Sequence, residues 1–325
     1  MNRPPKDGVR VDHEKLRAFV DQAGQAVGLP AEKAGLLAEL LVANELRGVN
    51  SHGTQQISAY TRLMREGKLN PKPQVEVVRE TPTSVLIDGD GGLGYFPAYE
   101  GTQRAVEKAR QVGMATMVSR NHGHFGAAGI YARLPLADDM IVYVTSGHQL
   151  HLQPGQDLLR AGGGSPMAFS APAGEEEDLV LDFGTMHGFY SDEVLPFLSK
   201  NSPGMILTTL GLGEFCQVWG GLLSGLGAQP ESRPWSWPGA NQGALVMVVR
   251  VDLFNDPAVF KGEVDKFIRG VGQLQPLEGF DRALTPGAIE AMRMKEYKEQ
   301  GILLGEWQQK RLGRVAERLE LELPW

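Results

Sequence analysis

The sequence predicts an α/β protein with a mixed β-sheet and a separate helical part built from both ends of the chain. Three observations lead to this prediction. Helical periodicity dominates residues 1–74, short β-branched runs alternate with helical stretches over residues 75–252, and helical periodicity returns over residues 253–325. We therefore expect the two terminal parts to pack together as a helical domain beside a central α/β domain.

Three helices are expected in the N-terminal part. Residues 1–10 look like a loose tail, and Asp12 is a good N-cap for the first helix. Pro30 begins a second helix, and a third, near residues 58–66, ends at Gly67. The apolar positions expected to face the core of this part are Leu16, Phe19, Val20, Ala23, Leu37, Leu40 and Leu41.

The central part alternates between strand-like and helix-like runs, which indicates a sheet covered by helices. Helices are expected over residues 98–113 and 126–137, the second being short and interrupted by glycine and proline. After the last strand, helices are expected over residues 256–270, 288–300 and 306–320. The expected strands are residues 75–78, 84–88, 114–119, 140–147, 166–171, 178–183 and 243–252.

Composition excludes several classes of function. The formal net charge is -7 and the basic residues are scattered, so no basic stripe is present that would bind nucleic acid. The single cysteine, Cys216, allows no intramolecular disulfide, and its apolar surroundings predict a buried packing residue. No secretory h-region and no uninterrupted apolar run of about 18 residues is seen. We expect a cytoplasmic protein with no membrane partner.

A glycine-rich stretch, IDGDGGLG, fits the dinucleotide-binding pattern G-x-G-x-x-G at Gly89, Gly91 and Gly94. The next strand of a Rossmann unit should end in an acidic residue, but here it ends in a segment containing Arg120, which is at most a hint of a 2′-phosphate site. Pro97 places the expected helix start some residues behind the glycines, whereas a pyrophosphate needs the helix directly behind them. The stretch is therefore interpreted as a tight multi-glycine turn.

Two histidine-containing stretches are candidates for chemistry. His52 lies in the loop Ser51-His52-Gly53 between two helices, and histidine suits proton transfer near neutral pH. The alternative is a loop histidine that only bonds to backbone. His122 and His124 follow a strand, where ligands gather in α/β sheets, and His124 is the candidate active-site residue. No third ligand stands near this pair, so no metal site is predicted.

Six stretches, in this order and spacing, resemble the malate/L-lactate dehydrogenase family that lacks a Rossmann fold. The resemblance covers nearly the whole chain and implies a mixed-sheet, non-Rossmann domain that binds NAD or NADP. It also implies an active site near a homodimer interface. The matching stretches are RGVNSHG with its following tyrosine (47–60), IDGDGGLG (87–94), RNHGHFGAAGIYA (120–132), GGGSPMAFSAPAG (162–174), LVLDFGT (179–185) and residues 284–307.

The resemblance also implies roles for individual residues. His52 would donate and accept the proton, with Ser51 beside it, while a hydride passes between the nicotinamide and a small 2-oxo acid or a related imine. His124 would lie in the nicotinamide and substrate pocket. The substrate-binding candidates are Arg47, Gln56 and Asn121. The cofactor-binding candidates are His124, Gly164, Ser165, Pro166 and Thr185.

The chain departs from the family at three places. Gln55 and Gln56 stand where an arginine usually follows the SHG motif, and Ala288 stands where a glutamate usually follows a glycine. Residues 186–202 form a shortened segment, and Thr208 occupies the place of an expected lysine. These departures keep two alternatives open. One is a cofactor-free enzyme that performs acid–base chemistry as an isomerase, cyclase or lyase, and the other is a non-catalytic scaffold.

Overall fold

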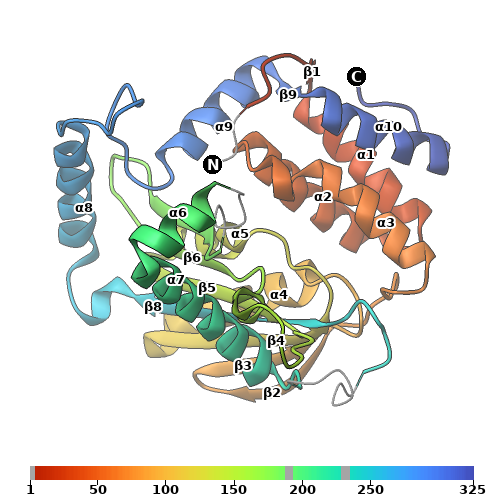
Figure 1. Cartoon of the computed structure of the whole chain (residues 1–325), viewed down its shortest axis with the longest axis horizontal. Coiled ribbons are helices and arrows are strands. Elements are labelled where there is room, and N and C mark those ends of the chain that lie inside the picture. The colour runs from red at the N-terminus through yellow and green to blue at the C-terminus, as the bar shows by residue number, and fades with distance from the viewer. Residues whose placement is uncertain (1–3, 187–192, 228–234) are drawn as a thin grey trace. The chain divides into compact units, whose positions relative to one another are not determined.

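The computed structural model describes residues 4–186, 193–227 and 235–325, and the chain divides into two units (Figure 1). Unit 1 comprises the chain up to Pro73 together with Lys266–Trp325, and unit 2 comprises Gln74–Asp265. The second boundary falls later than the expected residue 253. Asp265 explains the difference, because its buried carboxylate accepts three backbone N–H groups from residues 174–176 at 2.9–3.1 Å.

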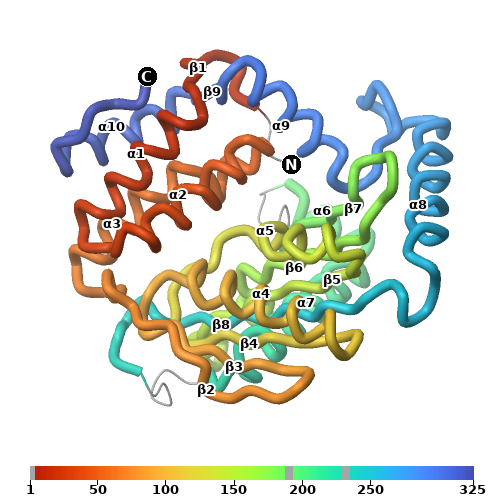
Figure 2. The backbone as a smooth tube through the Cα atoms, turned by 180° about the vertical axis from the view of Figure 1, so that it is seen from behind, coloured from red at the N-terminus to blue at the C-terminus, as the bar shows by residue number. Residues whose placement is uncertain are grey.

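Unit 1 is a helical unit in which the two ends of the chain meet. The predicted cap is confirmed, since the Asp12 carboxylate accepts backbone N–H groups of Glu14 and Lys15. The predicted loose tail is wrong, because Val9–Val11 pairs antiparallel with Ile302–Leu304 and joins the termini (Figure 2). The elements are β1 (Val9–Val11), α1 (His13–Ala26), α2 (Ala31–Leu46), α3 (Ile57–Arg65), α9 (Ala288–Gln300), β9 (Ile302–Leu304) and α10 (Glu306–Leu319).

Unit 2 is built on a seven-stranded mixed sheet, as predicted. The strand order is β2-β3-β4-β8-β5-β6-β7, and among the described strands only β3 and β4 run parallel. This parallel pair brings the carboxyl ends of both strands to one edge of the sheet. The strands are β2 (Glu76–Thr81), β3 (Ser84–Asp88), β4 (Met114–His122), β5 (Met140–His148), β6 (Pro166–Ala171), β7 (Leu179–Gly184) and β8 (Gln242–Arg250).

Helices cover both faces of this sheet. Figure 1 shows α6 (Val194–Asn201) and α7 (Pro203–Cys216) in front of the sheet, and Figure 2 shows α4 (Tyr95–Val112) and α5 (Ala128–Arg133) on the opposite face. Helix α8 (Pro257–Gly272) contains the boundary between the two units, which falls after Asp265. Two of these helices, α6 and α7, were not predicted from the sequence.

Glycines allow the turn after α7 to lie directly on strand β5. A Cβ atom at Gly220 would lie 2.4 Å from the backbone nitrogen of Gly147, and one at Gly147 would lie 2.5 Å from that of Gly221. No side chain fits between these backbones. Cys216, at the end of α7, is fully buried, which confirms the predicted packing role.

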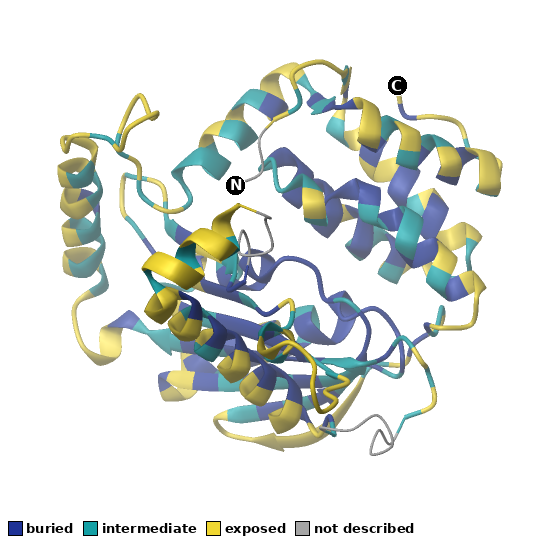
Figure 3. Ribbon diagram, viewed as in Figure 1, coloured by how far each residue is buried: buried dark blue, intermediate teal, exposed yellow. Residues whose placement is uncertain are grey.

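The outer side of α6, α7 and the turns that follow is exposed (Figure 3), and it carries many large apolar side chains. We call this surface the α6–α7 apolar face. The helical segment Pro203–Ser224 is also long and apolar enough to cross a membrane, judged by length and composition alone. Glu214 interrupts this segment, so it is not the uninterrupted apolar run of about 18 residues that the sequence analysis looked for. The exposed large apolar residues of the face are Val194, Phe197, Met205, Leu207, Leu212, Phe215, Val218, Trp219, Leu222 and Leu223.

Candidate functional site

The glycine-rich stretch forms a turn whose amides are used inside the protein. Gly89 N–H donates to the carbonyl of residue 120, Gly91 N–H to that of Asn121, and Gly94 N–H to that of His124, at 2.9–3.0 Å. A pyrophosphate site needs these N–H groups to point at the ligand. The interpretation as a tight turn, rather than a Rossmann fingerprint, is confirmed.

One argument behind that interpretation was wrong. Helix α4 begins at Tyr95, directly behind Gly94, and not beyond Pro97. Pro97 fits in the first turn because an N–H group there would have no partner within the helix. The Trp237 ring packs directly against the glycine turn. A Cβ atom at Gly91 (φ 75°) would lie 2.1 Å from this ring.

Asp88 organises the edge where β3 and β4 end side by side. The parallel register pairs Asp88 with Arg120, and the Arg120 Nε atom lies 3.0 Å from the Asp88 carboxylate. Asn121 takes a left-handed conformation (φ 53°) and donates its amide to the other Asp88 oxygen at 2.7 Å. Its own Oδ1 atom is buried and has no partner within the described parts of the chain. The sequence analysis missed Asp88, although it ends a predicted strand.

His122 is a structural residue and not a ligand. Its side chain is fully buried, with Nε2 2.9 Å from Ser119 Oγ and Nδ1 2.7 Å from the Gly123 carbonyl oxygen. Burial lowers its pKa to about 4. The carbonyl can only accept, so Nδ1 donates and Nε2 accepts from the serine hydroxyl. His124, two residues further on, is half-buried. The described residues contain no group of three or more His, Cys, Asp or Glu side chains that could hold a metal ion.

In unit 1, His52 lies on a loop of two short 3-10 turns between α2 and α3. Ser51 Oγ lies 2.9 Å from His52 Nδ1, so the two residues singled out from the sequence are in contact. Asn44 of α2 donates its side-chain amide to the His52 carbonyl at 2.9 Å. Burial lowers the pKa of His52 below its usual 6.5, which favours the neutral imidazole.

A fully buried carboxylate, Glu45, lies directly beneath this loop. Its Oε2 atom accepts the Thr54 backbone N–H at 2.6 Å and the Thr54 hydroxyl at 2.8 Å, and its Oε1 atom accepts the Gln308 amide at 2.6 Å. Burial raises its pKa to about 7, although all three hydrogen bonds favour the carboxylate.

The sequence analysis missed Glu45 even though its position carried a signal. Glu45 follows Leu37 and Leu41 at intervals of four residues, which places it on the buried face of a helix. A charged residue on such a face is rarely buried without partners, so its position indicates a buried, hydrogen-bonded carboxylate.

Other candidates in unit 1 make local contacts. Arg47 donates to the Ala43 carbonyl at 2.9 Å, and Gln56 donates to the Ser51 carbonyl at 2.5 Å. Gln55 donates in the same way to the Asn50 carbonyl. In the position of the family's arginine, therefore, two neutral amides brace the backbone of the histidine loop.

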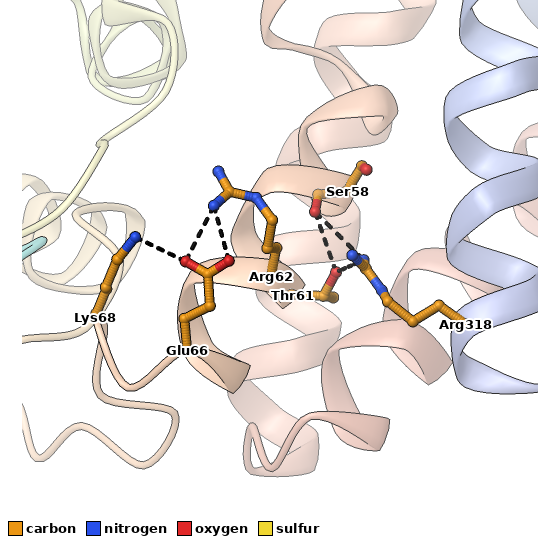
Figure 4. Close-up of polar contacts among 6 residues, drawn as sticks. All are labelled: Ser58, Thr61, Arg62, Glu66, Lys68 and Arg318. Atoms are coloured by element: carbon orange, nitrogen blue, oxygen red, sulfur yellow. Dashed lines mark hydrogen bonds and ion pairs between the residues drawn. The ribbon is translucent and has the colours of Figure 1, made fainter.

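Arg62 of α3 is a cation near the histidine loop in sequence that could replace the arginine missing after the SHG motif. Its guanidinium, however, is already paired with a carboxylate. Its guanidinium contacts both oxygens of Glu66 at 3.1 Å, and Glu66 also pairs with Lys68 (Figure 4). Arg318 of α10 donates to the hydroxyl of Thr61 on the same helix at 2.6 Å. These contacts connect α3 to the turn that follows it, at residues 66–68, and to α10.

The cofactor candidates of unit 2 lie around the start of β6. Gly164 is exposed, with open space around its Cα, and Pro166 begins the strand. The Ser165 hydroxyl is occupied, since it donates to the Gly162 carbonyl and accepts the Gln217 amide at 2.6 Å.

The Thr185 hydroxyl is buried and has no partner among the residues that the structure describes. It faces Gly213 of α7, where a Cβ atom would lie 3.0 Å away. Two features of unit 2 are free to contact a bound dinucleotide: the open backbone at Gly164 and the Asn121 Oδ1 acceptor. The Ser165 side chain and the Thr185 hydroxyl serve the packing of this loop under α7.

The departure over residues 186–202 is only partly visible, because residues 187–192 lie outside the described chain. The rest of the segment, and the region in which the lysine was expected, form α6 and α7. Thr208 is an exposed residue of α7. The two histidines of interest belong to different units, His52 to unit 1 and His124 to unit 2.

Comparison with known proteins agrees with this arrangement. The family model described as malate/L-lactate dehydrogenase matches residues 11–187 and 208–312. Malate dehydrogenase from Pyrococcus horikoshii is 26% identical, over 97% of this chain and 96% of the relative, and its solved structure superposes with a TM-score of 0.84 at 25% identity, covering 99% of both chains.

Two further relatives act on other substrates. L-sulfolactate dehydrogenase from Methanocaldococcus jannaschii is 28% identical, over 84% of this chain and 86% of the relative. Ureidoglycolate dehydrogenase (NAD(+)) from Escherichia coli O157:H7 is 24% identical, over 90% and 92% respectively. With the family model covering most of its length and the mixed sheet of its relatives, the chain belongs to the malate/L-lactate dehydrogenase family of oxidoreductases.

Proposed function

We propose that the protein is an NAD(P)H-dependent oxidoreductase that reduces a small 2-oxo acid or a related imine, with His52 as general acid and base. The observation that carries this proposal is the histidine loop. His52 contacts Ser51 Oγ, and burial lowers its pKa below 6.5. Two residues of α2 hold the loop backbone: Asn44 donates to the His52 carbonyl, and Glu45 accepts the Thr54 N–H. Proton transfer to a carbonyl requires an imidazole that is held in place and can gain and lose a proton.

The reaction needs one proton from the protein. When bound, reduced nicotinamide supplies the hydride to the C2 carbon of the substrate. As negative charge develops on the carbonyl oxygen, protonated His52 donates its proton there, and in the oxidation direction neutral His52 takes it back. Ser51 orients the ring through Nδ1. His124 and Asn121 are the proposed cofactor-contacting residues of unit 2, with the unused Asn121 Oδ1 atom accepting an N–H group.

The two neutral amides favour particular substrates. An arginine binds a carboxylate through two charge-assisted hydrogen bonds, which Gln55 and Gln56 cannot reproduce. We therefore propose that the substrate carries less negative charge near the histidine loop than malate does, and an imine or an amide of a 2-oxo acid meets this condition. Arg47, one helical turn along α2 from its acceptor Ala43, is the proposed carboxylate contact.

Titration with NADH and with NADPH tests the cofactor assignment. We expect saturable quenching of tryptophan fluorescence at micromolar concentrations of one of the two. Gly164→Val, which fills the open space at the proposed cofactor loop, should weaken binding about tenfold or more, since it blocks close approach to the backbone. Gly262→Val, at an equally open glycine on α8, is the matched control and should bind as the wild type does. Absence of binding to either cofactor at millimolar concentrations contradicts the proposal.

One observation favours a second candidate function. The match to the family model is interrupted between residues 187 and 208, the segment in which the sequence departs from the family. A cofactor-free enzyme that uses His52 for isomerisation, cyclisation or elimination fits that interruption. The same titration separates the two functions, because only the oxidoreductase binds the nicotinamide.

We also propose that the protein forms a homodimer through the α6–α7 apolar face. Large exposed apolar surfaces usually mark interfaces, and a stable one covers about 800 Å² on each partner. Leu207 and Leu223 are 59% and 61% exposed, so replacing both with glutamate should convert a dimer to the 35.4 kDa monomer in sedimentation equilibrium. Val259→Glu on α8, at a side chain that is 55% exposed, is the control and should leave the mass unchanged. A wild type that sediments as a monomer contradicts this proposal.

Cytoplasmic localisation and the absence of nucleic-acid or membrane partners stay predictions.

A further inference from the structure

We infer that Glu45 is a positioning residue for His52, because it fixes the catalytic loop from below and connects that loop to α10. The inference rests on the proposed role of His52 as general acid and base. Glu45 itself is placed in contact with Thr54, Gln308 and Gly53, and it acts on the imidazole through the loop backbone.

The connection runs through one carboxylate. Oε2 receives both donors of Thr54, two residues after His52, and Oε1 receives the Gln308 amide from the first turn of α10. The other end of that amide accepts the Gly305 N–H at 2.9 Å and so caps α10. Glu45 therefore ties the histidine loop to the C-terminal part of unit 1.

The loop has little freedom to move against this anchor. A Cβ atom at Gly53 would lie 2.1 Å from the Glu45 Oε2 atom, so the backbone next to His52 is in direct contact with the carboxylate. Asn44, the neighbour of Glu45 on α2, holds the His52 carbonyl. The backbone is thus held both at the histidine and two residues beyond it, which limits the positions that the imidazole can take.

A carboxylate is the group that this position requires. All three surrounding hydrogen bonds come from donors, and a carboxylate is the side chain that only accepts. In Glu45→Gln one amide N–H group would face a donor, which leaves a buried polar group unsatisfied. We expect kcat to fall about tenfold to a hundredfold, the range that a displacement of about 1 Å at a catalytic group causes.

Thr54 offers a milder test with an internal rescue. Thr54→Val keeps the shape of the side chain and removes only the hydroxyl bonded to Glu45, whereas Thr54→Ser keeps the hydroxyl. We expect kcat to fall about tenfold in the valine variant and to recover in the serine variant, with the Kd for NADH unchanged in both. Asp265→Asn is the matched control, because Asp265 is also a buried carboxylate that holds three donors, but it lies in unit 2. It should lower stability and leave kcat unchanged.

A second measurement does not depend on turnover. The rate at which diethyl pyrocarbonate modifies His52, followed on its peptide by mass spectrometry, should rise severalfold in Glu45→Gln and Thr54→Val and stay at the wild-type value in Thr54→Ser and Asp265→Asn. Wild-type rates of both turnover and modification in Glu45→Gln and Thr54→Val would overturn the positioning role. A wild type with no nicotinamide-dependent turnover would instead overturn the proposed function, and the modification rates would still decide whether Glu45 positions His52.

Discussion

Replacing His52 with glutamine should lower kcat for carbonyl reduction by about two to four orders of magnitude, which is the usual contribution of a positioned general acid. Glutamine fills a similar volume and can still contact Ser51, but it carries no transferable proton. Cofactor binding should be unchanged, because the proposed cofactor residues lie in unit 2. Stopped-flow measurement of NADH oxidation, beside fluorescence titration of the cofactor, separates the two effects.

The pH dependence of the wild type completes this test. Only protonated His52 can donate, and its pKa is lowered by burial, so the rate of reduction should fall as pH rises, with its midpoint below 6.5. The oxidation rate should rise over the same range. His151→Gln removes an exposed histidine whose ring nitrogen contacts the Gln153 amide, and it should leave both profiles unchanged. Near-normal turnover in His52→Gln would remove His52 from the chemistry.

The elements that could be predicted from the sequence are those with a local signal. The helix capped by Asp12 and the strand over residues 84–88 were found because caps and β-branched runs are local signals. The pairing of Val9–Val11 with Ile302–Leu304 was missed because it joins segments at opposite ends of the chain, and a three-residue strand has no readable period. Helix α7 was missed because it is apolar around most of its circumference, which hides the usual amphipathic pattern.

The motif residues of the candidate site could be predicted from the sequence. The residues that hold the histidine loop in place could not. Ser51 and His52 are neighbours in sequence, so their contact needed no tertiary information. Glu45 and Gln308 meet only when α10 folds back on α2, a contact between residues far apart in the chain. Gly53 shows the same limit, because a glycine in a loop suggests a special φ, whereas here its φ of -88° is ordinary and the carboxylate beneath it excludes a side chain.

The second large effect expected is loss of stability in acid through His122. Its pKa in the folded protein is about 4, against about 6.5 for an unfolded histidine. Above pH 6.5 both states are neutral. As pH falls from 6.5 towards 4, the unfolded state binds a proton that the folded state refuses, so the free energy of unfolding declines. The shift corresponds to about 3 kcal/mol, a large share of the stability of an ordinary domain.

Urea unfolding of the wild type at pH 7.5, 6.5, 5.5 and 4.5 measures this decline, and His122→Asn identifies its source. The variant should be less stable at pH 7.5, because it loses the fitted contacts to Ser119 and the Gly123 carbonyl, but its stability should fall much less steeply in acid. Tyr131→Phe is the matched control, since it removes a buried hydrogen bond to Phe125 in the same unit, and burial raises the pKa of Tyr131, which keeps it far from this range. It should be destabilised and keep the wild-type slope. An equal slope in His122→Asn would assign the acid sensitivity to other groups, and the buried imidazole would then serve only to close the turn against which Gly89 and Gly94 pack.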